Sequence, residues 1–201
     1  MSAMSVSKAT SLQRTLILGG ARSGKSAHAE QLALAAASEF GKELIYIATA
    51  QACDTEMASR IGQHRQRRDA NAAARWITVE EPLALGAALT QWCAPQRLVL
   101  VDCLTVWLSN LLFSETRDYP EVGHIDPPAS FVEQRALFLQ ALAQAAGDVI
   151  LVSNEVGMGV VPQGAVSRWF VDEAGRLNQA VAAACERAVL VVAGLPMVLK
   201  G

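Results

Sequence analysis

The chain has 201 residues, of which 52% are hydrophobic and 18% are charged, and its formal net charge is −2. This length fits one α/β domain, and the composition is apolar enough for a sheet that is buried on both faces. The charge argues against a nucleic-acid partner held by counterion release, so any basic site has to be local.

The two ends of the chain give no sign of a membrane or secretion segment. Residues 1–13 are polar and rich in serine, which predicts a disordered leader before a single domain over residues 14–201. The apolar run at 188–199 contains Gly194 and Pro196 and is too short to span a bilayer. The cysteines are scattered without C-x-x-C spacing, which favours reduced core thiols and a cytoplasmic protein (Cys53, Cys93, Cys103, Cys185).

Short apolar runs alternate with longer helical patterns along the chain. We expect strands at residues 15–18, 44–48, 76–79, 98–101, 149–153 and 189–193. We expect helices at residues 25–40, 55–68, 82–93, 104–113, 130–146 and 167–187. Most strands lack polar alternation, so the pattern predicts an α/β fold with a mostly parallel, P-loop NTPase-type sheet and helices on both faces. Residues 114–128 and 154–164 are predicted loops, where substrate contacts are commonly found.

The most informative motif follows the first strand and reads G-x-x-x-x-G-K-S. Its glycines let backbone N–H groups converge on phosphate oxygens, and the next helix presents its positive N-terminal end. The lysine would neutralise charge on the β- and γ-phosphates, and the serine hydroxyl would reach Mg²⁺. We call residues 19–26 the phosphate loop, and we expect it to bind a nucleoside triphosphate through Gly19, Gly20, Ala21, Arg22, Ser23, Gly24, Lys25 and Ser26.

Asp102 ends the apolar run at 98–101, in the manner of a Walker B acid. An acid at the carboxyl end of a buried parallel strand can hold Mg²⁺ beside the phosphate loop. The alternative is an Asp that caps the following helix. The phosphate loop upstream makes us favour the metal role.

The predicted helix at 55–68 carries an unusual basic stripe. Arg60, His64 and Arg68 recur at helical spacing with Arg67 beside them. An imidazole among guanidinium groups tends to stay neutral, and a neutral imidazole beside bound phosphates is a competent nucleophile. The alternative is a solvated basic helix with a surface histidine. From the residues alone we favour this second interpretation.

Taken together, these segments resemble the bifunctional adenosylcobinamide kinase / adenosylcobinamide-phosphate guanylyltransferase family from about residue 15 to the C-terminus. The segments that carry the resemblance are GGARSGKS at 19–26, YIATAQ at 46–51, DTEMASRIGQH at 54–64, WITVE at 76–80, DCLT at 102–105, NLL at 110–112, SNEVGMGVVP at 153–162 and GRLNQ at 175–179. Two features depart from the family pattern. Asp102 replaces the glutamate of some relatives, and residues 69–75 look like a small alanine-rich insertion.

The resemblance implies that the chain phosphorylates adenosylcobinamide with ATP or GTP and then transfers GMP from GTP to the product through a guanylylated histidine. The matching histidine is His64, which reverses the interpretation from the residues alone, and Lys25 assists it. The resemblance also implies Mg²⁺ at Ser26 and Asp102, and a homo-oligomer such as a trimer. Nucleotide contacts beyond the phosphate loop are expected from Thr49, Ala50, Gln51, Arg65, Gln66, Arg67, Arg68, Glu80 and Asp102.

Two other functions remain open at this point. The chain could be a simple small-molecule P-loop kinase that uses His64 only for binding, or a regulatory module that binds GTP without turnover. The loops at 114–128 and 154–164 are the candidates for corrinoid contacts, on position alone.

Overall fold

The computed structural model describes residues 14–51, 62 and 75–201. The predicted leader at 1–13 lies outside the described residues, and so does the predicted helix at 55–68 apart from Gly62. None of the helices in the described part is long and apolar enough to cross a membrane.

The core of the molecule is one seven-stranded sheet with the order β3-β2-β4-β5-β1-β6-β7. All neighbouring strands pair in parallel except β6 and β7, which pair antiparallel. The strands are β1 (Arg14–Gly19), β2 (Glu43–Ala48), β3 (Trp76–Glu80), β4 (Arg97–Asp102), β5 (Asp148–Asn154), β6 (Arg187–Val192) and β7 (Leu195–Lys200).

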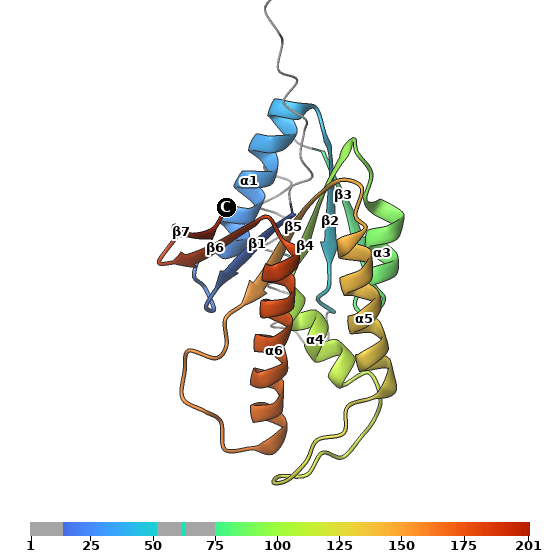
Figure 1. Cartoon of the computed structure of the whole chain (residues 1–201), viewed down its shortest axis with the longest axis vertical. Helices are drawn as coiled ribbons and strands as arrows, with labels where there is room; N and C mark the ends of the chain where they lie inside the picture. Colours follow the sequence, from blue (N-terminus) through green and yellow to red (C-terminus); the bar gives the residue numbers. More distant parts are fainter. Residues whose placement is uncertain (1–13, 52–61, 63–74) are drawn as a thin grey trace, which may run out of the picture.

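Helices cover both faces of this sheet, so the predicted fold class is confirmed (Figure 1). Helix α1 (Lys25–Phe40) covers one face, where Ala29 and Ala33 pack on Ile17, Leu100 and Val152. The opposite face carries α3 (Leu85–Trp92), α4 (Leu104–Leu112), α5 (Ala129–Ala143) and α6 (Ala165–Ala184), which share the larger core cluster. We call the first face the α1 face.

Strand β7 was missed in the sequence. The sequence pattern predicts only one strand in this region, at 189–193, and none after Gly194. In the structure, Ala193 (φ 52°) and Gly194 (φ 80°) form a tight turn between β6 and β7. Proline is tolerated in β7 because this strand lies at the edge of the sheet.

Several element ends also differ from the prediction. Helix α6 begins at Ala165 and ends at Ala184, because Arg187 already belongs to β6. Helix α5 ends at Ala143 rather than at 146, and α3 begins at Leu85 rather than at 82. In contrast, α1 has the predicted bounds.

Candidate nucleotide site

The phosphate loop joins β1 to α1 at the carboxyl edge of the sheet. Its turn needs left-handed backbone at Arg22 (φ 56°) and Gly24 (φ 94°), and the second of these positions suits glycine. Lys25 opens α1 and is only 9% exposed, and its Nζ donates a hydrogen bond to the carbonyl oxygen of Gly20 at 3.1 Å. The lysine is therefore folded back over the loop, where it can exchange this carbonyl for a phosphate.

Position 19 requires glycine because Ser23 and the backbone of Val191 lie close to it. A Cβ on this residue would lie 2.4 Å from the Ser23 Oγ and 2.6 Å from the backbone oxygen of Val191. The Ser23 hydroxyl is buried there and has no hydrogen-bond partner among the described residues. An unsatisfied buried hydroxyl is costly, so a ligand oxygen at this place would stabilise the loop.

The turn between β6 and β7 supports the loop from the outside. The backbone N–H of Gly194 donates to the backbone oxygen of Ser23 at 2.8 Å. A Cβ on Gly24 would approach the Cα of Gly194 to 3.2 Å, so the two backbones touch. The missed strand β7 thus belongs to the hairpin that holds the phosphate loop in place.

Asp102, the predicted metal ligand, ends β4 and points to the α1 face. Its Oδ2 accepts a hydrogen bond from the Tyr46 hydroxyl at 3.1 Å. The pKa of the neighbouring Cys103 thiol is affected by nearby charges. Burial and then the Asp102 charge raise its pKa to about 12, and the Lys25 ammonium acts in the opposite direction. Lys25 and Asp102 therefore influence the same small region.

Thr49, a predicted nucleotide contact, is fully buried and serves the backbone instead. Its Oγ1 donates to the carbonyl oxygen of Cys103 at 2.8 Å and accepts from the Cys103 N–H at 2.9 Å. The Thr49 carbonyl accepts from Nδ2 of Asn110 at 2.7 Å. The two following residues, Ala50 and Gln51, are half-buried and exposed, so they remain available to a ligand.

Asn154 ends β5 between the two predicted parts of the site. The sequence pattern includes it in the 154–164 loop but predicts no nucleotide contact for it. It lies in register with Gly19 on β1, and two residues earlier Val152 lies in register with Asp102 on β4. The available signal was a polar residue at the end of an apolar strand, the same signal that identified Asp102.

Glu80 ends the edge strand β3 and is exposed. It is in register with Ala48 of β2, which is in register with Asp102. Registered residues of parallel strands point to the same face, so Glu80 and Asp102 lie on the α1 face with the phosphate loop. Glu80 is four strand positions from β1, which is roughly 19 Å at about 4.8 Å per strand.

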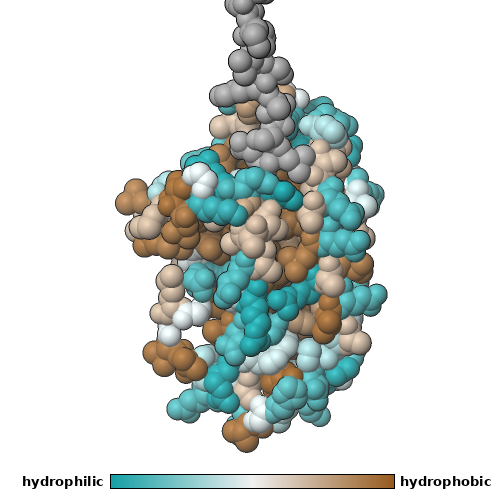
Figure 2. All heavy atoms as spheres, in the orientation of Figure 1, coloured by the Kyte–Doolittle hydropathy of each residue, from teal (hydrophilic) through white to brown (hydrophobic). Residues whose placement is uncertain are grey.

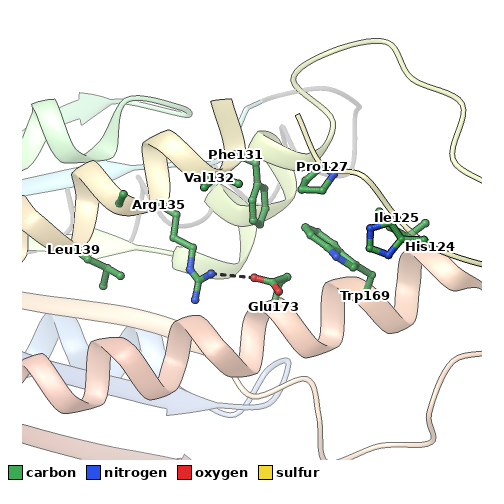
Figure 3. A pocket seen from close by; sticks show the side chains of 10 residues that line it. His124, Ile125, Pro127, Phe131, Val132, Arg135, Leu139, Trp169 and Glu173 are labelled. Carbon is green, nitrogen blue, oxygen red and sulfur yellow. Dashed lines mark hydrogen bonds and ion pairs between the residues drawn. The ribbon is translucent and has the colours of Figure 1, made fainter. Parts of the chain in front are cut away.

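A cavity of about 420 Å³ lies on the opposite face of the sheet, between α5, α6 and the end of the 114–128 loop (Figure 3). Phe131 and Trp169 form an aromatic wall with ring centroids 5.0 Å apart. Arg135 Nη1 donates to Glu173 Oε2 at 3.1 Å, while the buried Arg135 Nε has no partner among the described residues. The cavity wall therefore combines aromatic side chains with the Arg135–Glu173 ion pair.

The remaining predicted residues cannot be placed. His64, Arg65, Gln66, Arg67 and Arg68 lie outside the described residues. Among residues 14–51, 62 and 75–201, no group of three or more His, Cys, Asp or Glu side chains could hold a metal ion. Cys93, Cys103 and Cys185 are free, and burial is the largest of the effects that raise the pKa of each thiol to about 12.

Comparison with known proteins agrees with these features. Residues 15–199 match the family model described as cobinamide kinase / cobinamide phosphate guanyltransferase. The bifunctional adenosylcobalamin biosynthesis protein CobP of Pseudomonas aeruginosa is 52% identical over 94% of this chain and 98% of its own length. Proteins named CobU from Salmonella typhimurium and Escherichia coli are 38% and 40% identical, each over 92% of this chain and 98% of its own length.

A solved structure with a similar arrangement is the flagellar accessory protein FlaH of Methanocaldococcus jannaschii. It has a TM-score of 0.47 and 14% identity, and the match covers 94% of this chain and 78% of FlaH. A likeness at this level carries no argument about the reaction.

Proposed function

Because this chain belongs to the cobinamide kinase / cobinamide phosphate guanyltransferase family, we propose that one nucleotide site serves both of its reactions and that His64 carries the guanylyl group between them. The kinase and guanylyltransferase activities place the chain in cobalamin biosynthesis. In the proposed sequence, adenosylcobinamide is phosphorylated first with ATP or GTP. GMP from GTP is then joined to the resulting phosphate.

The observation that carries this proposal is the row of groups on the α1 face at the carboxyl edge of the sheet. The phosphate loop lies at one end, Asp102 in the middle and Glu80 at the other end. The roughly 19 Å span between β1 and β3 suits a nucleotide that lies along the edge with its base near Glu80. A carboxylate there would accept hydrogen bonds from the N1–H and the 2-amino group of guanine, which adenine lacks.

The chemistry of the donor set fits Mg²⁺. This ion prefers hard oxygen ligands and is commonly bound through one or two carboxylates together with substrate phosphates. The Asp102 carboxylate and the Ser26 hydroxyl in the first turn of α1 would hold it. When bound, Mg²⁺ would neutralise charge on the phosphate oxygens.

The guanylyl transfer is proposed as two displacements. A neutral His64 nitrogen would form a bond to the α-phosphorus of GTP as the bond to the bridging oxygen breaks and pyrophosphate leaves. The remaining ring N–H would lose its proton to solvent. An oxygen of the cobinamide phosphate would then displace the histidine, which leaves as neutral imidazole after taking up a proton. Lys25 and the backbone N–H groups of the phosphate loop would stabilise charge on the leaving pyrophosphate.

The corrinoid is proposed to contact the loops at 114–128 and 154–164 and the cavity between α5 and α6. Both loops follow elements at the carboxyl edge of the sheet, and they touch where the Ala165 N–H donates to the Glu121 carbonyl at 3.0 Å. A corrinoid is a broad apolar ring edged with carboxamides. The aromatic wall would suit the apolar ring, and the Arg135–Glu173 pair in the lining would suit the carboxamides at its edge.

We also propose that the chain forms a homo-oligomer, with a trimer as the family resemblance implies. Strand β7 is an edge strand, and the side chains of Leu195, Met197 and Leu199 are more than half exposed. Figure 2 shows hydrophobic side chains gathered over the β6–β7 hairpin. A second copy is the proposed partner of this surface. The cytoplasmic location stays a prediction.

Incubation with α-³²P-labelled GTP and Mg²⁺ tests the proposed reaction. We expect covalent label that is labile in acid and stable in alkali, and its loss in His64→Ala. The matched control is His124→Ala, an exposed histidine, which should label normally. Absence of label in the unmodified chain would contradict the histidine intermediate. Phosphate transfer to cobinamide would then favour a simple kinase, and its absence a regulatory GTP-binding module.

A further inference from the structure

We propose that the Asn154 carboxamide is a catalytic group of the kinase reaction, which donates a hydrogen bond to the γ-phosphoryl group during its transfer. The inference rests on the proposed binding of the nucleotide phosphates in the phosphate loop. It adds to that binding a contact from a different strand, between Asn154 of β5 and the γ-phosphoryl group that reacts.

The register of the sheet directs Asn154 toward the phosphates. Asn154 follows Val152 by two residues, and Val152 packs in the core cluster on the α1 face. Side chains two apart on a strand share a face, so Asn154 projects to the side that carries the phosphate loop. Its strand partner there is Gly19, where a Cβ would collide with Ser23 Oγ. No side chain at position 19 stands between Asn154 and the loop.

The position of Lys25 identifies which end of the nucleotide Asn154 would meet. In phosphate loops of this type, the lysine reaches the β- and γ-phosphates. Here the Lys25 Nζ lies 3.1 Å from the backbone oxygen of Gly20, which is the residue next to Gly19. The Gly19–Gly20 end of the loop therefore corresponds to the γ-phosphate, and Asn154 is the registered neighbour of that end.

The backbone of Asn154 is held from the opposite face of the sheet. Its N–H donates to Thr105 Oγ1 of α4 at 2.7 Å, and its carbonyl accepts from Asn178 Nδ2 of α6 at 3.1 Å. The buried Ser153 hydroxyl connects these two groups by donating to Asn178 Oδ1 at 2.7 Å and lying 3.2 Å from Thr105 Oγ1. A buried and mutually satisfied network of this kind rigidifies the residue it holds.

The next residue ties the same backbone to the phosphate loop, because the Glu155 N–H donates to the Gly19 carbonyl at 3.1 Å. By contrast, the Asn154 carboxamide makes no hydrogen bond with the described residues, and neither does Ser23 Oγ. A rigid backbone that carries an unpartnered donor is the arrangement expected of a preorganised contact to a reacting group.

In the phosphoryl transfer, an oxygen–phosphorus bond forms between the corrinoid hydroxyl and the γ-phosphorus. The bond to the β,γ-bridging oxygen breaks, its electron pair leaves with the nucleoside diphosphate, and the hydroxyl proton passes to solvent. Asn154 gains and loses no proton. Its N–H donor would stabilise the equatorial oxygens of the transferring group, where charge is concentrated in the transition state.

The test compares the two reactions of the full-length enzyme in Asn154→Ala and Asn154→Asp. Loss of one preorganised donor commonly lowers kcat by roughly 10²-fold. We expect a fall of this order in the kinase kcat of Asn154→Ala and a larger fall in Asn154→Asp, which adds a like charge. In Asn154→Ala, the KM for ATP should change less than about threefold. Guanylylation of His64 moves no γ-phosphoryl group, so its rate should stay within about threefold. The control Gln140→Ala removes an exposed carboxamide from α5 and should change neither reaction.

Several outcomes would overturn the proposal. A kinase kcat of Asn154→Ala within about twofold of the unmodified enzyme would do so. An equal fall in both reactions, together with a lower melting temperature, would show that Asn154 is only structural. If the unmodified enzyme phosphorylates no cobinamide, the proposed function fails instead. The measurement therefore separates the two failures.

Discussion

Thr49 was predicted to lie near the nucleotide, but its side chain was not predicted to bond to the protein backbone. Its hydroxyl makes two hydrogen bonds to the backbone of Cys103, the residue that follows Asp102. The backbone N–H of Thr49 also donates to the Asp102 carbonyl at 3.2 Å. The side chain thus fixes the exit of β4, and any influence on the nucleotide would pass through Asp102. Asn154 shows the opposite case, since its backbone is hydrogen-bonded within the fold and its side chain is the group that we propose contacts a ligand.

We expect Thr49→Val to destabilise the protein, because it leaves the buried N–H of Cys103 without its partner, while the Cys103 carbonyl keeps the Trp107 N–H. One unsatisfied buried group costs about 1–3 kcal/mol, so the free energy of unfolding in urea should fall by roughly that amount. Thr49→Ser keeps the hydroxyl and should lose less than about 1 kcal/mol. A Thr49→Val protein of normal stability with weakened nucleotide binding would instead make Thr49 a direct contact.

At the scale of elements, each candidate ligand site is supported by a pair of neighbouring strands or helices. The β6–β7 turn supports the phosphate loop through the Gly194 N–H. On the face opposite α1, side chains of α4 and α6 hydrogen-bond to the backbone at the end of β5. Helices α5 and α6 enclose the cavity, where Glu173 is paired with both Arg135 and Arg176. The candidate nucleotide site and the cavity proposed for the corrinoid therefore depend on different neighbouring elements.

Arg135→Gln tests whether the α5–α6 cavity serves the corrinoid. The substitution removes the guanidinium group and its ion pair with Glu173 but keeps the first two methylene groups of the side chain. We expect the KM for cobinamide to rise about fivefold to tenfold, as loss of a hydrogen bond of about 1–1.5 kcal/mol implies, with the KM for GTP unchanged. Arg97→Gln, which removes an ion pair with Glu43 at the amino ends of β4 and β2, away from both loops, is the control for charge alone. Equal cobinamide KM values in all three proteins would remove the cavity from the site.

At the scale of the whole molecule, the candidate nucleotide site lies at the carboxyl edge of the sheet, and exposed apolar side chains lie on the edge strand β7. The carboxyl ends of the parallel strands gather the phosphate loop, Asp102 and Asn154. The β6–β7 hairpin exposes apolar side chains while its turn touches the phosphate loop. Association through this hairpin would therefore lie directly beside the nucleotide site.

We expect the double variant Leu195→Glu with Met197→Glu to reduce the mass of the particle to that of one chain. Two carboxylates on the edge strand would be buried at great cost in an interface between copies. Light scattering after size-exclusion chromatography measures the mass. Phe40→Glu, at the exposed end of α1, is the control and should leave the mass unchanged. An unmodified protein that is already a single chain would contradict the proposed oligomer.

The sequence by itself determined the fold class, the phosphate loop and the family, because each depends on local patterns. A buried parallel strand is a continuous apolar run, and a phosphate loop needs its glycines and lysine at fixed spacing. The sequence also indicated that Asp102 lies near the loop.

Only the tertiary structure decided what depends on register and on distant partners. Residue 154 meets residue 19 through strand pairing, and Gly194 meets Ser23 through a hairpin turn. The Thr49 side chain bonds to the backbone because the fold places Cys103 next to its hydroxyl. The antiparallel edge strand was missed because a proline and a left-handed turn break its pattern locally. Such contacts join residues far apart along the chain, and no local pattern encodes them.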